Sequence, residues 1–208
     1  MKNIAFIINP MSGTQNKRRL PKLIIELLDK RQWLENIVFS ERVGHAELLA
    51  RQYATMGFDA VVAVGGDGTV REVAQAVACT KTALGILPMG LTNTLARHLG
   101  IPLRGNSSIT WINHSEPVLC DSLSVRIDDK KQLTAMCSVT AGETRIINCA
   151  QGMKTSIQDG VAEGLTDETQ RLEMNGHVII DNDEYEVEER IETSILPDSV
   201  HILAPKRF

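Results

Sequence analysis

Apolar and polar positions alternate in blocks along the first hundred residues of the chain. Short apolar runs, typical of buried strands, are each followed by a segment in which apolar residues recur every three or four positions, as on one face of a helix. Strands are predicted at residues 3–10, 35–41, 59–66 and 83–90, and helices at 17–32, 45–57, 69–78 and 92–100. Because strands that alternate with helices form βα units, we expect an α/β fold around a mostly parallel sheet.

The pattern changes after residue 103, where turn residues begin to separate the apolar runs. Such spacing indicates antiparallel strands. Strands are predicted at 118–128, 132–141, 144–150 and 199–205, a hairpin at 177–192, and a polar loop with one helix at most at 151–176. We therefore expect an α/β domain over residues 1–117 and a smaller β-rich domain over residues 118–208.

Three of the predicted parallel strands end in loops of unusual composition, "NPMSG", "GGDGT" and "PMGLTN". The carboxyl ends of parallel strands meet at one edge of the sheet, and ligands bind there. The glycines around Asp67 would leave backbone N–H groups exposed at a helix start, which attracts phosphate. Asp67 could then hold a metal-bound phosphate or orient a hydroxyl, and Thr69 could cap the helix or bind a phosphate oxygen. An ordinary strand-to-helix turn is the alternative, since glycine and aspartate favour one.

The composition narrows the class of protein. The chain has 208 residues and a formal net charge of -4, which argues against a dedicated nucleic-acid binder. No stretch approaches the ~18 apolar residues needed to cross a bilayer, and the histidines and cysteines lack the spacing of a metal site. We therefore expect a cytoplasmic protein, with contact at a membrane surface left open. The basic residues Lys17, Arg18 and Arg19 either contact anionic headgroups or form a solvated helix face.

The motifs "NPMSG", "GGDGTVREV" and "LPMGLTNTLARHLGIP", in this order, resemble the three signature loops of the diacylglycerol kinase and sphingosine kinase catalytic domain. That family shares its fold and the GGDG loop with NAD kinases and phosphofructokinases, but the first and third motifs are its own. The resemblance implies a lipid kinase that transfers the γ-phosphate of ATP, with Mg²⁺, to a diacylglycerol-like acceptor. It also implies peripheral contact with the inner face of a membrane.

The resemblance assigns the site residue by residue. The residues expected to bind the nucleotide are Asn9, Ser12, Gly13, Gly65, Gly66, Gly68, Thr69, Gly90 and Asn93. Asp67 would lie near the magnesium ion and act in catalysis. Relatives carry an acidic D-G-E turn before a final "LP" and terminal strand, and the acid of this turn acts as general base. Counting back from Pro197 places that acid at Glu184, with Asp183 beside it.

The sequence departs from the family pattern in three places. Leu91 stands where the family has a threonine, the tip "DNDE" lacks the glycine of D-G-E, and the second domain is short, with the missing length expected at residues 150–175. A solvated hairpin tip is the alternative for Asp183 and Glu184. A catalytically impaired nucleotide-binding protein on the same scaffold is the alternative function, and an NAD kinase is a third.

Overall fold

The computed structural model describes residues 1–13, 17–136, 138–141, 144–147, 169–181 and 183–205. The chain divides into two compact units. The first comprises Met1–Leu119 together with the strand residues from Val200 on, and the second comprises Cys120–Ser199. The predicted second domain ran from residue 118 to residue 208, whereas in the structure the residues from Val200 on belong to the first unit. The reason is that Ile202 pairs with Leu84, which returns the last strand to the first unit.

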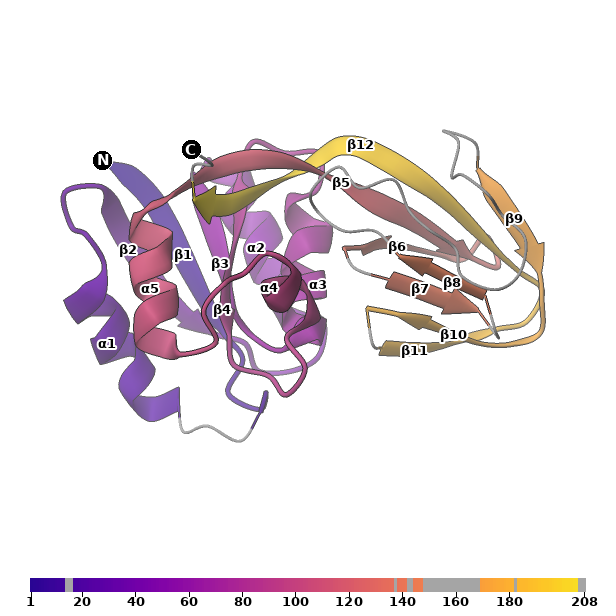
Figure 1. Cartoon of the computed structure of the whole chain (residues 1–208), viewed down its shortest axis with the longest axis horizontal. Helices are drawn as coiled ribbons and strands as arrows, with labels where there is room; N and C mark the ends of the chain where they lie inside the picture. The colour runs from indigo at the N-terminus through magenta and orange to yellow at the C-terminus, as the bar shows by residue number, and fades with distance from the viewer. Residues whose placement is uncertain (14–16, 137, 142–143, 148–168, 182, 206–208) are drawn as a thin grey trace. The chain divides into compact units, whose positions relative to one another are not determined.

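The first unit is built on a parallel sheet (Figure 1). Its strands are β1 (Lys2–Ile8), β2 (Trp33–Phe39), β3 (Ala60–Gly65), β4 (Ala83–Pro88) and the C-terminal end of β12 (Arg190–Pro205), in the order β2-β1-β3-β4-β12. Every residue of β3 and β4 is buried, as in strands covered on both faces. This burial explains the continuous apolar runs in the sequence, and the predicted α/β fold is confirmed.

Helices connect these strands. They are η1 (Lys17–Arg19), α1 (Leu20–Leu27), α2 (His45–Thr55), α3 (Asp67–Val77), α4 (Thr94–His98) and α5 (Gly105–Asn113). The chain moves one way along the sheet from β1 to β2 and the other way from β2 through β3 to β4. Right-handed connections therefore place α1 on one face and α2 and α3 on the other. The direction of winding reverses between β1 and β3, and the crevice beyond the strand ends at such a point is where open α/β sheets bind ligands.

None of the described helices is both long enough and apolar enough to cross a membrane.

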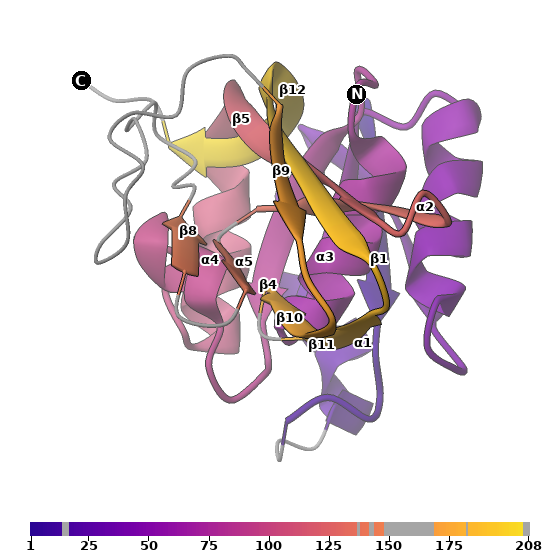
Figure 2. The same cartoon turned by 90° about the vertical axis from the view of Figure 1, so that its right-hand side faces the viewer.

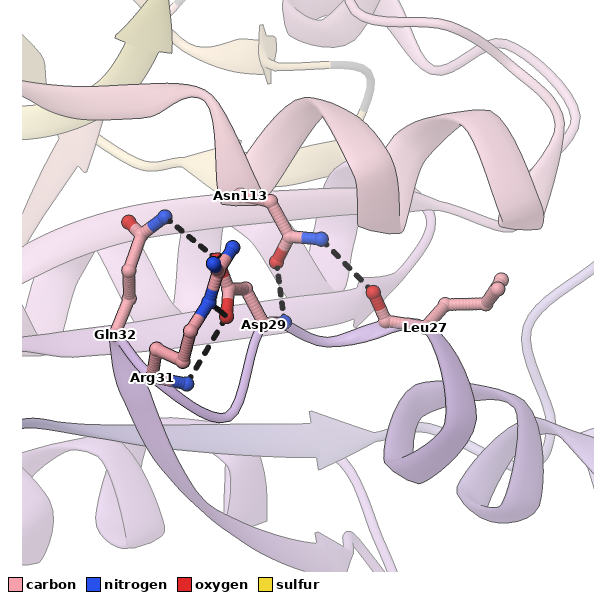
Figure 3. A network of polar contacts seen from close by, with 5 residues as sticks. All are labelled: Leu27, Asp29, Arg31, Gln32 and Asn113. Carbon is pink, nitrogen blue, oxygen red and sulfur yellow. Dashed lines mark hydrogen bonds and ion pairs between the residues drawn. The ribbon is translucent and has the colours of Figure 1, made fainter.

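Helix α1 is shorter than the predicted helix at 17–32, because a polar network ends it (Figure 3). Leu28 is extended, with φ -72° and ψ 133°. Asn113, the last residue of α5, accepts a hydrogen bond from Asp29 N at 2.9 Å and donates one to Leu27 O at 2.8 Å. The carboxylate of Asp29 accepts hydrogen bonds from Arg31 and Gln32 in the turn that leads into β2. The turn between α1 and β2 is thereby tied to α5.

Helix α5 was not predicted from the sequence. Its segment "GNSSITWIN" has a weak apolar period and begins with residues that favour turns. Its apolar residues Ile109 and Ile112 are nevertheless fully buried in the same cluster as Leu20 and Ile24 of α1. Packing against α1 therefore forms this helix despite its low intrinsic propensity.

The second unit contains the antiparallel end of the eight-stranded sheet and a separate four-stranded antiparallel sheet (Figure 1 and Figure 2). Parts of β5 (Ser115–Ile127) and β12 pair with β6 (Lys131–Ala135) and β9 (Gln170–Glu173), while β7 (Ser138–Ala141), β8 (Thr144–Ile147), β10 (Gly176–Ile180) and β11 (Asp183–Val187) form the order β11-β10-β7-β8. One buried cluster holds side chains from both sheets, among them Leu123, Val125, Leu133, Val139, Val178, Ile180, Val187 and Ile191. The predicted β-rich second half is confirmed.

Details of the second unit differ from the prediction. The single strand expected at 132–141 is two strands, β6 and β7, which belong to different sheets. Residues 190–205 form one long strand in place of a hairpin arm and a separate final strand. The hairpin tip is as predicted, since Ile180 pairs with Asp183 across it. Most of the loop predicted at 151–176 lies outside the described residues, but its end contains β9.

Candidate active site at the carboxyl ends of the parallel strands

The loop after β1 is anchored by Asn9. Its backbone N–H donates to Val64 O at 3.0 Å, which continues the pairing of β1 with β3. Its side-chain oxygen accepts from Met11 N at 2.9 Å, and its side-chain nitrogen donates to Thr69 Oγ1 at 3.0 Å. Asn9 therefore holds two of the signature loops together across the point where the winding reverses. The expected convergence of these loops at one edge of the sheet is found.

Lys17 also holds the loop after β1, through contacts with Ser12. Its ammonium group donates to the backbone oxygen of Ser12 and to Ser12 Oγ, the latter at 2.7 Å. Only 5% of Lys17 is exposed, and this burial lowers the pKa of its ammonium group. Neither expectation for Lys17, a headgroup contact or a solvated helix face, is correct. One lysine of the basic run, Lys17, thus has a structural role, because it fixes the first signature loop.

Glycine is required where the loops pack backbone against backbone. Gly13 has φ +61°, and a Cβ placed on it would overlap the backbone oxygen of Met89. A Cβ on Gly90 would overlap the Cα of Gly66. The loops after β1 and β3 therefore both abut the loop after β4, at distances that no other residue permits. This close approach is a role of the glycines that the phosphate-binding hypothesis alone did not include.

Asp67 joins the second signature loop to the third. It is the first residue of α3, two positions before the predicted helix start, and Gly68 and Thr69 follow in the first turn. One carboxylate oxygen of Asp67 accepts from Thr94 N at 2.6 Å, and the other accepts from the Thr92 hydroxyl. A single acidic side chain thus lies at the junction of the two loops.

The third signature loop is shaped by Asn93. This residue has φ +50° and is buried, and its side chain bonds both backbone groups of Gly90, each at 2.8 Å. Leu91 is 79% exposed, so the position at which the family has threonine carries no polar contact here. The hydroxyl that meets Asp67 comes from Thr92 instead. Although Leu91 replaces the family's threonine, the neighbouring Thr92 still provides a hydroxyl group at the Asp67 junction.

The two candidate general bases lie on β11 in the second unit. Glu184 is exposed, with its carboxylate 3.5 Å from His177 Nδ1, and Asp183 is half-buried. The acid of this hairpin that the structure buries is Asp181, which is 4% exposed and accepts a hydrogen bond from Met136 N at 2.7 Å. Sequence reasoning did not single it out, although its place directly after the buried Ile180 was a signal.

Among the residues that the structure describes, no group of three histidine, cysteine, aspartate or glutamate side chains could hold a metal ion. A magnesium ion carried by nucleotide phosphates needs fewer protein ligands, commonly one or two carboxylates. Asp67 supplies one carboxylate at the ends of β3 and β4. The residues present therefore fit a metal that arrives with a nucleotide and do not form a separate cage.

Helix α3 begins without a side-chain cap. Its N-cap residue is Gly66, which has no side chain with which to cap the first turn. Uncapped N–H groups and the positive end of the helix dipole attract anions. Together with the Asp67 junction, this makes the edge suited to binding phosphate groups and a cation.

Comparisons with known proteins agree on one family. The sequence model of the diacylglycerol kinase catalytic domain matches residues 3–125. Diacylglycerol kinases of Staphylococcus aureus strains RF122 and MRSA252 are 36% identical over 122 residues, a match that covers 56% of this chain and 38% of each relative. The matched part of the chain thus corresponds to well under half of these relatives.

Solved structures share the fold over nearly the whole chain. A diacylglycerol kinase from Bacillus anthracis strain Sterne superposes with a TM-score of 0.63 at 15% identity, covering 98% of this chain and 97% of that one. A second solved structure from the same strain gives a TM-score of 0.74 at 12% identity, with the same coverage. With the matched motifs and their geometry in place, the chain belongs to the diacylglycerol kinase catalytic domain family.

Proposed function

We propose that the protein is an ATP-dependent lipid kinase, which transfers the γ-phosphate of ATP to the hydroxyl group of a diacylglycerol-like lipid. The observation that carries the proposal is the junction at Asp67, where the GGDG loop meets the loop after β4 in a chain that matches the family over residues 3–125. The Staphylococcus aureus relatives are diacylglycerol kinases, which favours diacylglycerol as the acceptor.

The nucleotide phosphates would lie at the start of α3. Backbone N–H groups of Gly66, Gly68 and Thr69 are the donors, and the helix dipole adds to the attraction. Asn9 and Asn93 have their side-chain amides engaged within the protein, so they act by fixing the loops. Because phosphoryl transfer depends mainly on positioning and on neutralising charge, rigid loops serve it directly.

Magnesium belongs to the same proposal. Bound between phosphate oxygens and the carboxylate of Asp67, the ion would neutralise the charge that develops on the phosphates. Thr92 and Thr94 hold that carboxylate in place by donating hydrogen bonds to it. These contacts orient Asp67 before any ligand is bound.

The lipid hydroxyl must lose a proton during transfer. Asp67 and the two acids on β11, Asp183 and Glu184, are the carboxylates proposed for this step. Single replacements by the amides distinguish them, since the base is the residue whose amide variant loses kcat together with the pKa on the acidic limb of the pH profile. Because the acceptor resides in a bilayer, the proposal also places the protein peripherally at the inner face of a membrane.

The test is a transfer assay with labelled ATP and Mg²⁺. Diacylglycerol, a sphingoid base and NAD are offered separately, and Asp67→Ala is the control. Phosphate transfer to diacylglycerol that depends on Asp67 is the expected result. Transfer to NAD alone would contradict the proposal and identify an NAD kinase.

A nucleotide-binding protein without transfer activity is the second candidate. It is favoured by the exposure of Glu184, whose side chain is 66% exposed, because catalytic bases are commonly held in a desolvated position. Tight ATP binding by calorimetry, with no transfer to any of the three acceptors, would establish this candidate in place of the kinase.

A further inference from the structure

Three apolar side chains of the first unit project into solvent. Val43, Met11 and Leu91 are 92%, 85% and 79% exposed. Among the described residues, Met1 is the only other large hydrophobic side chain that is exposed to a similar degree. Single exposed apolar residues are common, but these three are not scattered.

All three lie at the same edge of the sheet. Met11 follows β1, Val43 follows β2 and Leu91 follows β4, and the three strands are parallel (Figure 1). Gly13 abuts the backbone of Met89, which brings the loops of Met11 and Leu91 together. These three residues, named here the apolar rim, therefore border the loops that carry the candidate active site.

The loop of Val43 is held at this edge by two contacts. Ser40 N donates to Ile8 O at 2.9 Å, which extends the pairing with β1, and Gly44 N donates to the carboxylate of Glu72 on α3 at 2.9 Å. The same carboxylate accepts from Ala46 N at 3.1 Å in the first turn of α2. Val43 is thus presented by a fixed loop, which reduces the entropy lost when its side chain is buried by a partner.

Cationic side chains accompany the rim. Arg42 is exposed and directly precedes Val43. Arg97 is exposed on α4 and donates to Thr92 O at 2.7 Å, one residue beyond Leu91. Arg18 and Arg19 are exposed in η1, which Lys17 ties to the loop of Met11. The acidic side chains at the same loops are Glu41, Asp67 and Glu72, and the last two accept hydrogen bonds from Thr94 N and Gly44 N, so the four arginines outnumber them.

We infer that the apolar rim and its arginines form a docking surface for an anionic lipid bilayer, an inference that rests on the proposed lipid kinase function. Short apolar side chains on fixed loops insert at the headgroup boundary, and adjacent arginines bind anionic headgroups. The rim consists of single side chains on three separate loops, which suits a fluid surface better than a folded protein partner. Docking brings the loops that bind ATP to the lipid acceptor.

The experiment measures binding of the whole chain to unilamellar vesicles, by sedimentation, without ATP or acceptor. The vesicles contain phosphatidylcholine with or without phosphatidylglycerol. The rim variant carries Met11→Gln, Val43→Thr and Leu91→Gln. The control variant carries Met56→Gln, Leu34→Thr and Ile25→Gln, three exposed apolar residues on other parts of the same unit. Thermal melting confirms that both variants fold.

Wild type and the control variant are expected to bind phosphatidylglycerol vesicles alike, and the rim variant at least about tenfold more weakly. Replacing Arg42 and Arg97 by glutamine is expected to weaken binding about tenfold, and the loss is expected to vanish at about 1 M salt. Equal binding by rim and control variants, or no binding by wild type, would overturn the inference. So would a wild type that self-associates in the ultracentrifuge while the rim variant is monomeric, because a second copy would then cover the rim.

The two proposals fail separately. Rim-dependent vesicle binding by a protein that transfers no phosphate contradicts the kinase proposal and leaves the docking surface in place. Phosphate transfer by a protein whose vesicle binding is indifferent to the rim contradicts the docking surface and leaves the kinase in place.

Discussion

The two edges of the parallel sheet in the first unit use polar groups in opposite ways. At the amino edge, the carboxylate of Asp29 accepts hydrogen bonds from Arg31 N, Nε and Nη2 and from Gln32 Nε2, and Asn113 satisfies the neighbouring backbone groups (Figure 3). At the carboxyl edge, the N-cap of α3 is a glycine, which has no capping side chain, and Asp67 links two loops. The amino edge ties its turn together with side-chain hydrogen bonds, whereas the carboxyl edge presents a helix N-terminus that has no capping side chain.

This difference in polar contacts indicates which edge is structural and which is functional, and the size of a cavity does not. The amino edge contains a pocket of about 630 Å³, lined by Lys2, Arg31, Trp33 and His114 among others. None of the signature residues lines it. The conclusion that the carboxyl edge carries the chemistry therefore rests on the N-terminus of α3, which has no capping side chain, and on the geometry of the loops. The variants that follow test it at both edges.

The largest effect is expected from Asp67→Asn at the carboxyl edge. The amide has nearly the shape of the carboxylate and can still bond Thr92 and Thr94, so the fold should be retained. It lacks the negative charge that would bind magnesium, and we expect phosphate transfer to fall by about 1000-fold or more. Transfer assays together with thermal melting check this. A variant that keeps a tenth of the activity would show that the junction is only structural.

The converse change is Asn113→Ala at the amino edge. It leaves Asp29 N and Leu27 O without their partner, and we expect the free energy of unfolding to drop by about 2 kcal/mol. Urea unfolding measures the loss, and kcat should stay within about twofold of wild type. Asn106→Ala on the exposed face of the same helix is the matched control and should leave stability nearly unchanged. A large loss of kcat from Asn113→Ala would break the distinction between the edges.

The sequence predicted the carboxyl edge well because each of its signals is local. Buried parallel strands such as β3 are continuous apolar runs, and the loops that follow them contain their own glycines and polar residues. What the polar side chains of those loops contact was not predictable in the same way. Asn9 was predicted to bind ATP, but the hydrogen bond from its side-chain nitrogen to Thr69, 60 positions away in the sequence, was not part of that prediction. Partners so distant are known only once the fold brings them together.

The amino edge and the second unit were predicted less well for a related reason. The end of α1 depends on Asn113, 84 positions beyond Asp29, and α5 forms by packing against α1 despite its weak apolar period. In the sequence Lys17 cannot be distinguished from its basic neighbours, and its burial is known only from the fold. In the β10–β11 hairpin the strands were predicted, but the burial of Asp181 and its contact with Met136, which comes from another segment, were not.

A third prediction concerns pH at the amino edge. Hydrogen bonds from Arg31, and then from Gln32, hold the pKa of Asp29 well below its usual range. The ionised carboxylate therefore stabilises the folded state fully above the pKa of the unfolded chain, about 3.9, and this contribution is lost as the pH falls below that value. We expect the gap in urea midpoint between wild type and Asp29→Asn to be constant near neutral pH and to narrow below about pH 4.

Glu26→Gln on the exposed part of α1 is the control for this titration, since the Glu26 carboxylate lies 3.7 Å from Lys22 at an exposed site. Its effect on the urea midpoint should be small at every pH. A gap for Asp29→Asn that persists undiminished at about pH 2 to 3 would mean that the carboxylate of Asp29 stabilises the turn by its shape and not by its charge.

The smallest effect is expected from Thr92→Val, which returns to the carboxyl edge. Valine removes the hydroxyl that bonds Asp67 while keeping the side-chain volume. Thr94 N still donates to the same carboxylate at 2.6 Å, so Asp67 loses part of its support and keeps the rest. We expect kcat to fall about fivefold to tenfold, in line with about 1 kcal/mol for one hydrogen bond, and Thr92→Ser to restore it. Full activity in Thr92→Val would show that Thr94 alone orients Asp67, and that the hydroxyl lost at Leu91 needs no replacement.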